Sequence, residues 1–319
     1  MIIIFIIILL ILFTIYFLNK NMNNNLKINH NNIAIISTYP SHIECVGFIL
    51  EYLDNYNIDI YIDGDMANYL DYFKSKYKFN HYHINKFNEI NYDKIIKLTS
   101  NDPYNIIKKH FSILHMSGNE YPGTKENTLF ITLTPFVKPT NFNYRYILSI
   151  YKDYINTNFI NKNIGFIGQF IADYVKNKND IINLIENIDG KLFLFGYIND
   201  KINNNRINNY ENINTINMVE KLKQCSYIII KEHDDRYSGG ITIALSLNIP
   251  LIMKKSIADI YGIPAIVYNE TINELTDYIN NININEYIKI KYNLRKFTDK
   301  QIEKNKYILK NLIKNDRSI

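Results

Sequence analysis

Short apolar runs alternate with amphipathic stretches along most of the chain, from about Asn32 to Asn280. Such runs, bounded by turn-forming residues, are typical of strands that are buried on both faces of a parallel sheet. In the first half we expect strands at Ile33–Ser37, Ile58–Ile62, Phe79–Ile84, Lys94–Thr99, Ile113–Met116 and Leu129–Leu133. In the second half we expect them at Ile164–Ile167, Lys191–Phe195, Ile213–Ile216, Tyr227–Ile230, Leu251–Met253 and Ala265–Tyr268.

Most of the stretches between these runs place apolar residues at the spacing of one helical face. The expected helices are His42–Tyr56, Met66–Tyr77, Asp180–Asn187, Met218–Gln224, Ile241–Leu247 and Ile272–Asn280, followed by Tyr287–Phe297 and Ile302–Ile313. Strands that alternate with helices predict α/β domains with mainly parallel sheets. A less regular stretch, Tyr144–Asn163, separates two sets of elements. We therefore expect domains over residues 33–150 and 151–284, and C-terminal helices over residues 285–319.

The N-terminal segment Ile2–Leu18 is almost wholly apolar and uncharged. Its length is at the short end of the roughly 17–25 residues that cross a bilayer. No small-x-small cleavage site follows, so we expect a single-pass membrane anchor over residues 1–18 rather than a cleaved signal peptide, and a polar tether over residues 19–32. Lys20 and Lys27 follow the apolar segment, and the positive-inside rule then places the bulk of the chain in the cytoplasm.

Composition excludes several classes of function for this chain of 319 residues. The net charge is +5 and no dense run of Lys and Arg occurs, so we expect no nucleic-acid partner. The two cysteines, Cys45 and Cys225, lie in apolar surroundings. Two such residues predict neither a disulfide framework nor a zinc site, and we expect two buried thiols.

The segment Ser226–Met253 carries the most specific chemical signal. Its buried strand leads into a polar loop, Lys231–Ser238, and Gly239 and Gly240 then open an apolar helix. The N-terminus of a helix presents free N–H groups and the positive end of its dipole, which suit a phosphate. Glycines at that point let a ligand approach the backbone.

Together with four other segments, this region resembles the GT-B glycosyltransferases. The resemblance rests on IAIISTYPSHIECVGFIL (Ile33–Leu50), IGFIGQF (Ile164–Phe170), KLFLFG (Lys191–Gly196), MVEKLKQCSYIII (Met218–Ile230) and DDRYSGGITIALSLNIPLI (Asp234–Ile252). It implies two Rossmann-like domains that face a cleft, an N-terminal one for the acceptor and a C-terminal one for a nucleotide-sugar donor. It also implies sugar transfer without a dissociable metal or a cofactor, to a glycan, lipid or protein acceptor.

The resemblance implies a set of donor-binding residues, with departures from the pattern of many retaining members. Their Glu-x7-Glu pair falls on Asp235 and Ile243 here, so only one carboxylate is kept. Where those members have a basic residue after the first glycine turn, this chain has Gln169. The nearest lysine is Lys176. The expected donor and diphosphate contacts are Gly168, Gln169, Lys176, Asp235, Arg236, Ser238, Gly239 and Gly240. Lys231 and Glu232 are further candidates for contacts to sugar or ribose, or parts of a solvated loop.

Two histidines are candidates for the acceptor side of the reaction. His115 ends an apolar strand, where the resembling family often places a His near the reacting sugar, and His42 lies in the first strand-to-helix loop. Either could act as a base or donate a hydrogen bond, and His115 could instead be a satisfied core residue. Asn119 and Glu120, just past His115, could face the same cleft or form a turn.

Three alternatives stay open at this point. Asp63-Gly64-Asp65 follows a strand, and two carboxylates at that spacing can hold Mg²⁺ or Mn²⁺ against a diphosphate, although Asp and Gly are also ordinary turn formers. Because the second Glu is absent, a second alternative is a catalytically inactive module that binds a sugar or a partner. A sugar-nucleotide epimerase of similar two-domain shape is the third alternative.

Overall fold

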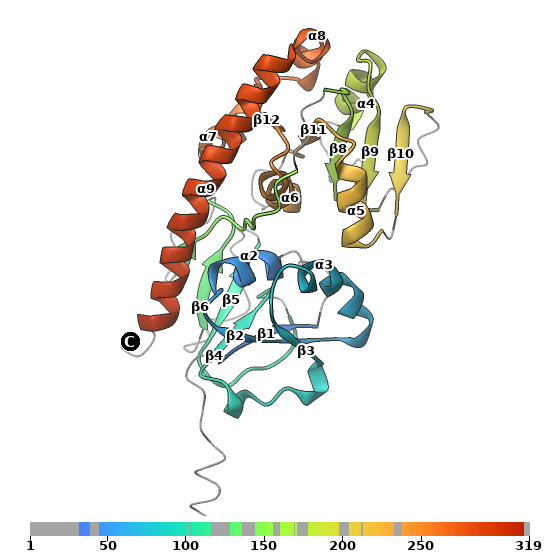
Figure 1. Cartoon of the computed structure of the whole chain (residues 1–319). Helices are drawn as coiled ribbons and strands as arrows, with labels where there is room; N and C mark the ends of the chain where they lie inside the picture. Colours follow the sequence, from blue (N-terminus) through green and yellow to red (C-terminus); the bar gives the residue numbers. More distant parts are fainter. Residues whose placement is uncertain are drawn as a thin grey trace, which may run out of the picture.

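The computed structural model shows two α/β domains, each built on a parallel β-sheet, one above the other, and a long helix that runs beside both (Figure 1). It describes residues 32–38, 45–100, 102–115, 128–135, 144–155, 160–168, 170, 178–197, 204–211, 213–232 and 238–315. The proposed anchor Ile2–Leu18 lies outside these ranges and stays a prediction. Within them, no helix is both long and apolar enough to cross a membrane.

The N-terminal domain is built on a sheet of seven parallel strands in the order β3-β2-β1-β4-β5-β6-β7. These are β1 (Asn32–Ser37), β2 (Asn57–Ile62), β3 (Asn80–His83), β4 (Lys94–Lys97), β5 (His110–Leu114), β6 (Thr128–Thr132) and β7 (Tyr144–Tyr146). Its helices are α2 (Cys45–Tyr52) and α3 (Asp71–Lys74), with 3-10 turns η1 (Gly64–Leu70), η2 (Ile84–Lys86) and η3 (Glu89–Asn91). The central strands β1 and β5 are buried along almost their whole length, and most of their residues are apolar.

The C-terminal domain has a six-stranded parallel sheet in the order β10-β9-β8-β11-β12-β13. Its strands are β8 (Ile164–Ile167), β9 (Leu192–Phe195), β10 (Ile207–Tyr210), β11 (Tyr227–Ile229), β12 (Leu251–Lys254) and β13 (Ile266–Tyr268). Its helices are α4 (Lys178–Glu186), α5 (Thr215–Leu222), α6 (Gly239–Leu247), α7 (Lys255–Tyr261) and α8 (Thr276–Asn281), with the 3-10 turn η4 (Ile272–Leu275). The strand order reverses between β8 and β11, and ligands of such sheets bind outside the carboxyl ends at that point.

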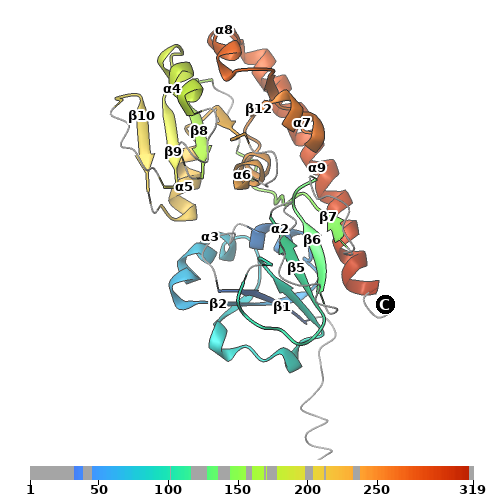
Figure 2. The same ribbon diagram turned by 180° about the vertical axis from the view of Figure 1, so that it is seen from behind.

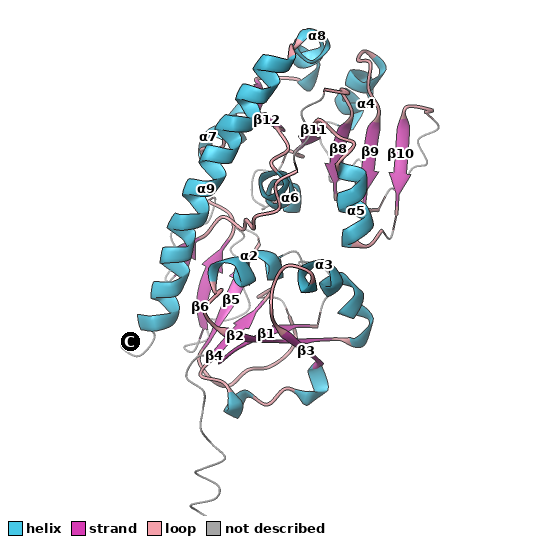
Figure 3. Ribbon diagram, in the orientation of Figure 1, coloured by secondary structure: helices cyan, strands magenta, loops and turns pink. Residues whose placement is uncertain are grey.

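Several expected elements differ from the structure. The helix expected at Met66–Tyr77 is mainly the 3-10 turn η1, followed by the short helix α3, and helix α7 was not expected. The strand expected at Ile213–Ile216 is wrong: β10 lies at Ile207–Tyr210, and a helix begins at Thr215, where the Asn214 side chain accepts from the Asn217 N–H at 2.9 Å. The two expected C-terminal helices are one helix, α9 (Ile284–Asn315), because no Gly or Pro interrupts it. Figure 3 shows this helix as one unbroken element.

Helix α9 and the linker 147–155 join the two domains. Seen from behind, α9 again extends from the C-terminal domain to the side of the N-terminal one (Figure 2). Its buried Asn305 donates to the Leu148 carbonyl at 3.0 Å, and Tyr52 of α2 donates to the same oxygen at 2.7 Å. The linker also meets α6, where the Ser149 and Thr242 hydroxyls lie 2.6 Å apart. Such buried polar contacts are costly to leave unpaired, so they fix how the domains meet.

Lys291 of α9 provides a pH-dependent test of this junction. Its ammonium group donates to the Ile155 carbonyl at 3.1 Å, and burial lowers the pKa of Lys291 to about 8. The lysine is protonated in the unfolded chain up to about pH 10.4, so below pH 8 the folded state bears the full cost of burying the charge. That cost disappears as the pH rises from about 8 to 10.4.

We therefore expect Lys291→Met to raise the free energy of unfolding at pH 7 by roughly 1 kcal/mol, because the relieved charge burial outweighs the lost hydrogen bond. The advantage should shrink as the pH rises towards 10, where the wild-type lysine is neutral in the folded state. Urea denaturation of both proteins from pH 7 to 10 measures this difference. An advantage that stays constant or grows with pH would contradict the burial account.

Candidate functional site

Two glycines lie side by side at the carboxyl edge of the C-terminal sheet. Gly168 follows β8 and Gly196 follows β9, with φ angles of 121° and 135° that side chains rarely adopt. The Gly168 N–H donates to the Phe195 carbonyl at 2.8 Å. A Cβ atom on Gly196 would lie 2.4 Å from the Gly168 carbonyl oxygen, whereas a Cβ atom on Gly168 would meet no atom of the described residues within 4 Å. Gly196 thus permits the close backbone approach, and the described residues leave space beside Gly168.

The N-terminus of α6 packs beside this glycine pair. Ser238 is its N-cap residue, is 5 % exposed and makes no side-chain cap hydrogen bond. A Cβ atom on Gly240 would lie 3.2 Å from Ile230 Cδ1, 3.3 Å from the Ser238 oxygen and 3.9 Å from Ile167 Cβ, at the end of β8. The positive end of the α6 dipole therefore lies next to the strand that carries Gly168.

Three polar side chains meet at the carboxyl ends of β11, β12 and β13. Glu232 accepts from the Lys254 ammonium group at 3.1 Å and from the Tyr268 hydroxyl at 3.0 Å. The Glu232 side chain is 13 % exposed and that of Lys254 is 33 % exposed. Sequence reasoning missed Lys254 and Tyr268, although Tyr268 ends an expected strand and Lys254 directly follows one. Glu232 is expected near the sugar, and each of its two carboxylate oxygens accepts a hydrogen bond from one of these donors.

The remaining donor-site candidates fall outside the described residues. They are Gln169, Lys176, Asp235 and Arg236. Their roles stay predictions. On the acceptor side, His42, Asn119 and Glu120 also lie outside the described ranges.

His115 lies directly after β5, at the carboxyl edge of the N-terminal sheet. It is 9 % exposed, and its Nε2 lies 2.9 Å from the Leu98 carbonyl oxygen. A carbonyl can only accept, so Nε2 carries a proton and only Nδ1 of the neutral ring can accept. The observed contact favours the core interpretation of this histidine, since it ties β5 to the segment that follows β4.

The Asp63-Gly64-Asp65 motif follows β2 and leads into the 3-10 turn η1, and the Asp65 side chain lies outside the described residues. Asp63 is half-exposed, and its carboxylate lies 3.8 Å from His83 Nε2. No group of three or more His, Cys, Asp or Glu side chains among the described residues could hold a metal ion. Asp63 instead precedes the 3-10 turn η1 as its N-cap residue, in line with the turn-forming interpretation.

A pocket of about 580 Å³ lies between the domains, where α3, the linker and α5 meet. Asp153 of the linker accepts from the Tyr72 hydroxyl and pairs with Lys76, both on the α3 side. Burial raises the pKa of Asp153 to about 6, with Lys223 opposing the rise and Glu220 adding to it. Because the Asp153 N–H also donates to the Ser246 carbonyl of α6 at 3.0 Å, this residue connects both domains.

Both cysteines are free and buried, as the sequence predicts. Burial raises the pKa of Cys225 to about 12. The Cys225 thiol is therefore protonated at neutral pH and a poor nucleophile.

Comparisons with known proteins bear on the fold. No protein-family model matches the chain, and no curated protein matches it in sequence. HepE of Anabaena, solved in complex with UDP, superposes with a TM-score of 0.57 at 11 % identity over 88 % of this chain and 99 % of that one. Sucrose-phosphate synthase of Thermosynechococcus elongatus gives 0.56 at 11 % identity, over 89 % and 98 %.

An E. coli structure described as trehalose-6-phosphate bound with UDP-2-fluoro glucose gives a TM-score of 0.52 at 8 % identity, over 89 % of this chain and 99 % of that one. Such neighbours, at such low identity, establish the fold alone. The two parallel α/β domains have the GT-B arrangement, which confirms that part of the predicted fold class.

Proposed function

We propose that this protein is a glycosyltransferase, which takes a nucleotide-sugar donor at the carboxyl edge of its C-terminal sheet. The observation that carries the proposal is the space that the described residues leave beside Gly168, next to the N-terminus of α6. Backbone N–H groups and the helix dipole there suit a diphosphate. Structures of the same fold hold UDP and UDP-2-fluoro glucose, which supports a nucleotide-sugar as the ligand class.

Catalysis would rest on fixed charges and dipoles that stabilise the departing nucleoside diphosphate. The α6 N-terminus, with Ser238, Gly239 and Gly240, supplies the dipole, and Arg236 and Lys176 are the cations expected from the sequence. Lys254 is a third cation, which the structure adds. It lies two strands from β8, about 10 Å at ordinary strand spacing, and Glu232 holds its ammonium group in place.

The acceptor would meet the N-terminal domain across the cleft. His115 lies at the carboxyl edge of that sheet and His42 belongs to its first strand-to-helix loop. In this scheme one of the two takes the proton of the attacking hydroxyl, which forms the new glycosidic bond as the nucleoside diphosphate leaves. The same scheme needs neither a metal ion nor a cofactor. The segment 2–18 would anchor the enzyme to the membrane, with its bulk in the cytoplasm.

The test is release of the nucleotide from its sugar conjugate by the full chain, with and without mixed glycan and lipid acceptors: UDP, dTDP or GDP from the diphosphate donors, and CMP from CMP-sugars. We expect release that needs an acceptor and that EDTA does not change. Loss of activity with EDTA and in Asp63→Ala would instead support the metal-dependent alternative. A changed sugar nucleotide formed without acceptor would indicate an epimerase. Donor binding without any release would indicate an inactive module.

Lys254→Met should weaken donor binding about tenfold, because a charged hydrogen bond or ion contact to phosphate contributes about 1.5 kcal/mol. The matched control is Lys255→Met, which removes the neighbouring lysine that pairs with Asp259 on the surface of α7. Isothermal titration with the preferred nucleotide measures both. Equal affinities of the two variants for the nucleotide would show that Lys254 does not contact the donor.

A further inference from the structure

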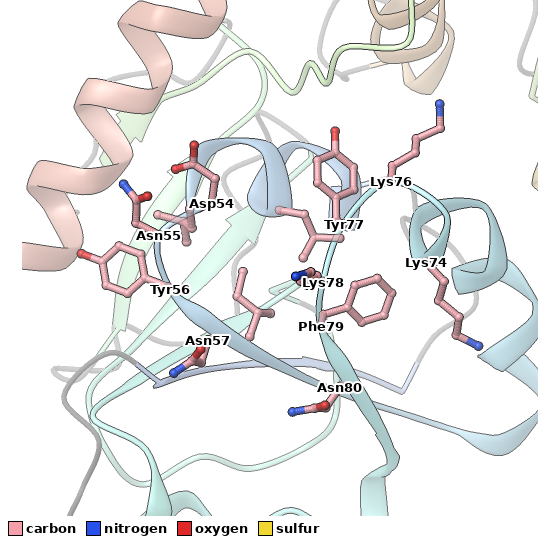
Figure 4. Close-up of a pocket in the computed structure, with 13 residues that line it drawn as sticks. Asp54, Asn55, Tyr56, Asn57, Lys74, Lys76, Tyr77, Lys78, Phe79 and Asn80 are labelled. Carbon is pink, nitrogen blue, oxygen red and sulfur yellow. The ribbon is translucent and has the colours of Figure 1, made fainter.

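A pocket of about 780 Å³ lies on the N-terminal domain, away from the sheet edge that carries His115. It is formed by the two loops that lead from α2 into β2 and from α3 into β3. Figure 4 shows Lys78 in the middle of this pocket, with Tyr56 and Asn57 on one side and Phe79 and Asn80 on the other. These loops precede their strands, so the pocket lies at the amino edge of the sheet.

The charges at this pocket favour an anionic ligand. Lys74, Lys76 and Lys78 line it. Lys74 pairs with the exposed Asp71 one turn earlier at 2.7 Å, and Lys76 pairs with Asp153, whereas Lys78 has no ion-pair partner among the residues that the structure describes. Asp54 is the acidic residue of the lining. Partial burial would raise its pKa, but the ammonium groups of Lys306 and Lys310, at 2.5 and 2.9 Å, hold the pKa of Asp54 below its ordinary value. Its negative charge is thus neutralised by two lysines of α9.

The chain enters the N-terminal domain at this same edge. Asn32, the first residue of β1, pairs in register with Asn57 of the pocket and accepts from its amide group at 3.1 Å. Residues 19–31 connect Asn32 to the apolar segment 2–18. A tether of that length spans about 45 Å when fully extended and about 20 Å on average as a flexible coil. An anchored chain therefore keeps this pocket within a short distance of the bilayer.

We propose that this pocket edge, with Lys74 and Lys78, docks on anionic phospholipid headgroups of the membrane that holds the anchor. The inference extends the anchoring part of the proposed function and does not depend on sugar transfer. Anionic lipids are enriched in the cytoplasmic leaflet. Each lysine close to such a surface strengthens binding of the protein to the membrane about fivefold. Docking would hold the N-terminal domain, and the acceptor site on it, in one orientation above the bilayer.

The test uses the full chain, reconstituted into vesicles of phosphatidylcholine alone or with about 30 % phosphatidylserine. A fluorophore is attached at Asn55→Cys, next to the pocket, and in a second sample at Asn281→Cys on α8, at the far end of the C-terminal domain in Figure 1. Cys45 and Cys225 are buried, so labelling is confined to the introduced thiol. The readout is quenching by lipids that carry a quencher on the headgroup.

We expect quenching at position 55 in the anionic vesicles, much weaker quenching in neutral ones, and little at position 281. About 0.5 M salt should reduce it through screening. Lys74→Glu with Lys78→Glu should lower the ratio of anionic to neutral quenching at least fivefold, whereas the matched reversal Lys289→Glu with Lys296→Glu on exposed turns of α9 should not.

Equal quenching in both kinds of vesicle, or equal quenching at positions 55 and 281, would overturn the proposal and leave a simple tether. Nucleotide binding by the same reconstituted samples separates this outcome from a failure of the proposed function. If the donor binds normally while quenching at position 55 is absent, only the docking surface is wrong. If quenching is as expected and no nucleotide binds, only the transferase assignment is wrong.

Discussion

Gly196→Ala should lower the free energy of unfolding by about 2–5 kcal/mol and abolish nucleotide binding. The φ of 135° at this residue costs a side chain about 1–3 kcal/mol. The new Cβ would also lie 2.4 Å from the Gly168 carbonyl oxygen, and a backbone atom cannot move away as a flexible side chain can. The forced separation of the ends of β8 and β9 would displace the glycine pair on which the donor site depends.

Gly168→Ala is the matched variant that separates folding from binding. The φ of 121° imposes a similar backbone cost, but no atom of the described residues lies within 4 Å of the added methyl group. We expect the protein to stay folded, with a loss of about 1–3 kcal/mol, and to lose donor affinity because the methyl group enters the space that the ligand needs. Urea denaturation and nucleotide titration of both variants measure these effects. A Gly196→Ala protein as stable as the wild type, or unchanged affinity in Gly168→Ala, would contradict the account.

Gly47→Ala should destabilise the junction between the domains by about 2–4 kcal/mol. In an isolated helix this change stabilises by about 1 kcal/mol. Here the added Cβ would lie 2.5 Å from Tyr151 Cδ1 and 2.6 Å from Phe73 Cε1, two rings that are fully buried. Overpacking of this kind forces shifts in the surrounding core, and Tyr151 belongs to the linker, so the shift reaches the domain interface.

A second substitution tests whether the steric clash is the cause. Tyr151→Leu removes the ring that the new methyl group meets, so the double variant Gly47→Ala with Tyr151→Leu should be less destabilised than the two single effects added together. Thermal and chemical denaturation of the three variants gives the coupling energy. Additive effects would show that the clash with the Tyr151 ring is not the cause of the destabilisation by Gly47→Ala.

The apolar pattern predicted the buried strands well because burial on both faces leaves an unbroken apolar run. It failed at two edge strands, although the exposed edge strand β3 lies within the expected strand Phe79–Ile84. Strand β10 reads Ile-Asn-Asn-Tyr and is an edge strand with only Ile207 buried, so its sequence carries little strand signal. Strand β7, also at a sheet edge, fell within a stretch expected to be irregular.

Part of the candidate site could be predicted from local sequence signals, and part of it depends on how the strands are ordered in the sheet. Gly168 and the Ser238–Gly240 helix start could be found from the sequence, because glycine after a strand and a cap before a helix are local signals. The contact between Glu232 and Lys254 spans 22 residues and that with Tyr268 spans 36, and both depend on the order of β11, β12 and β13 in the sheet. No local pattern contains that order. The same holds for Asp153, whose partners Tyr72 and Lys76 come from the other domain.

The most direct test of the central claim is nucleotide binding by the full chain, measured by isothermal titration and by thermal unfolding with UDP, dTDP, GDP and CMP. The account predicts that one nucleotide family binds, stabilising the protein by about 2.7 kcal/mol at one hundred times its dissociation constant. It also predicts that Gly168→Ala loses this binding while Gly262→Ala, at a helix end with open space around it, keeps it. No binding of any nucleotide to a folded wild-type sample, or equal binding by both variants, would contradict the proposed donor site.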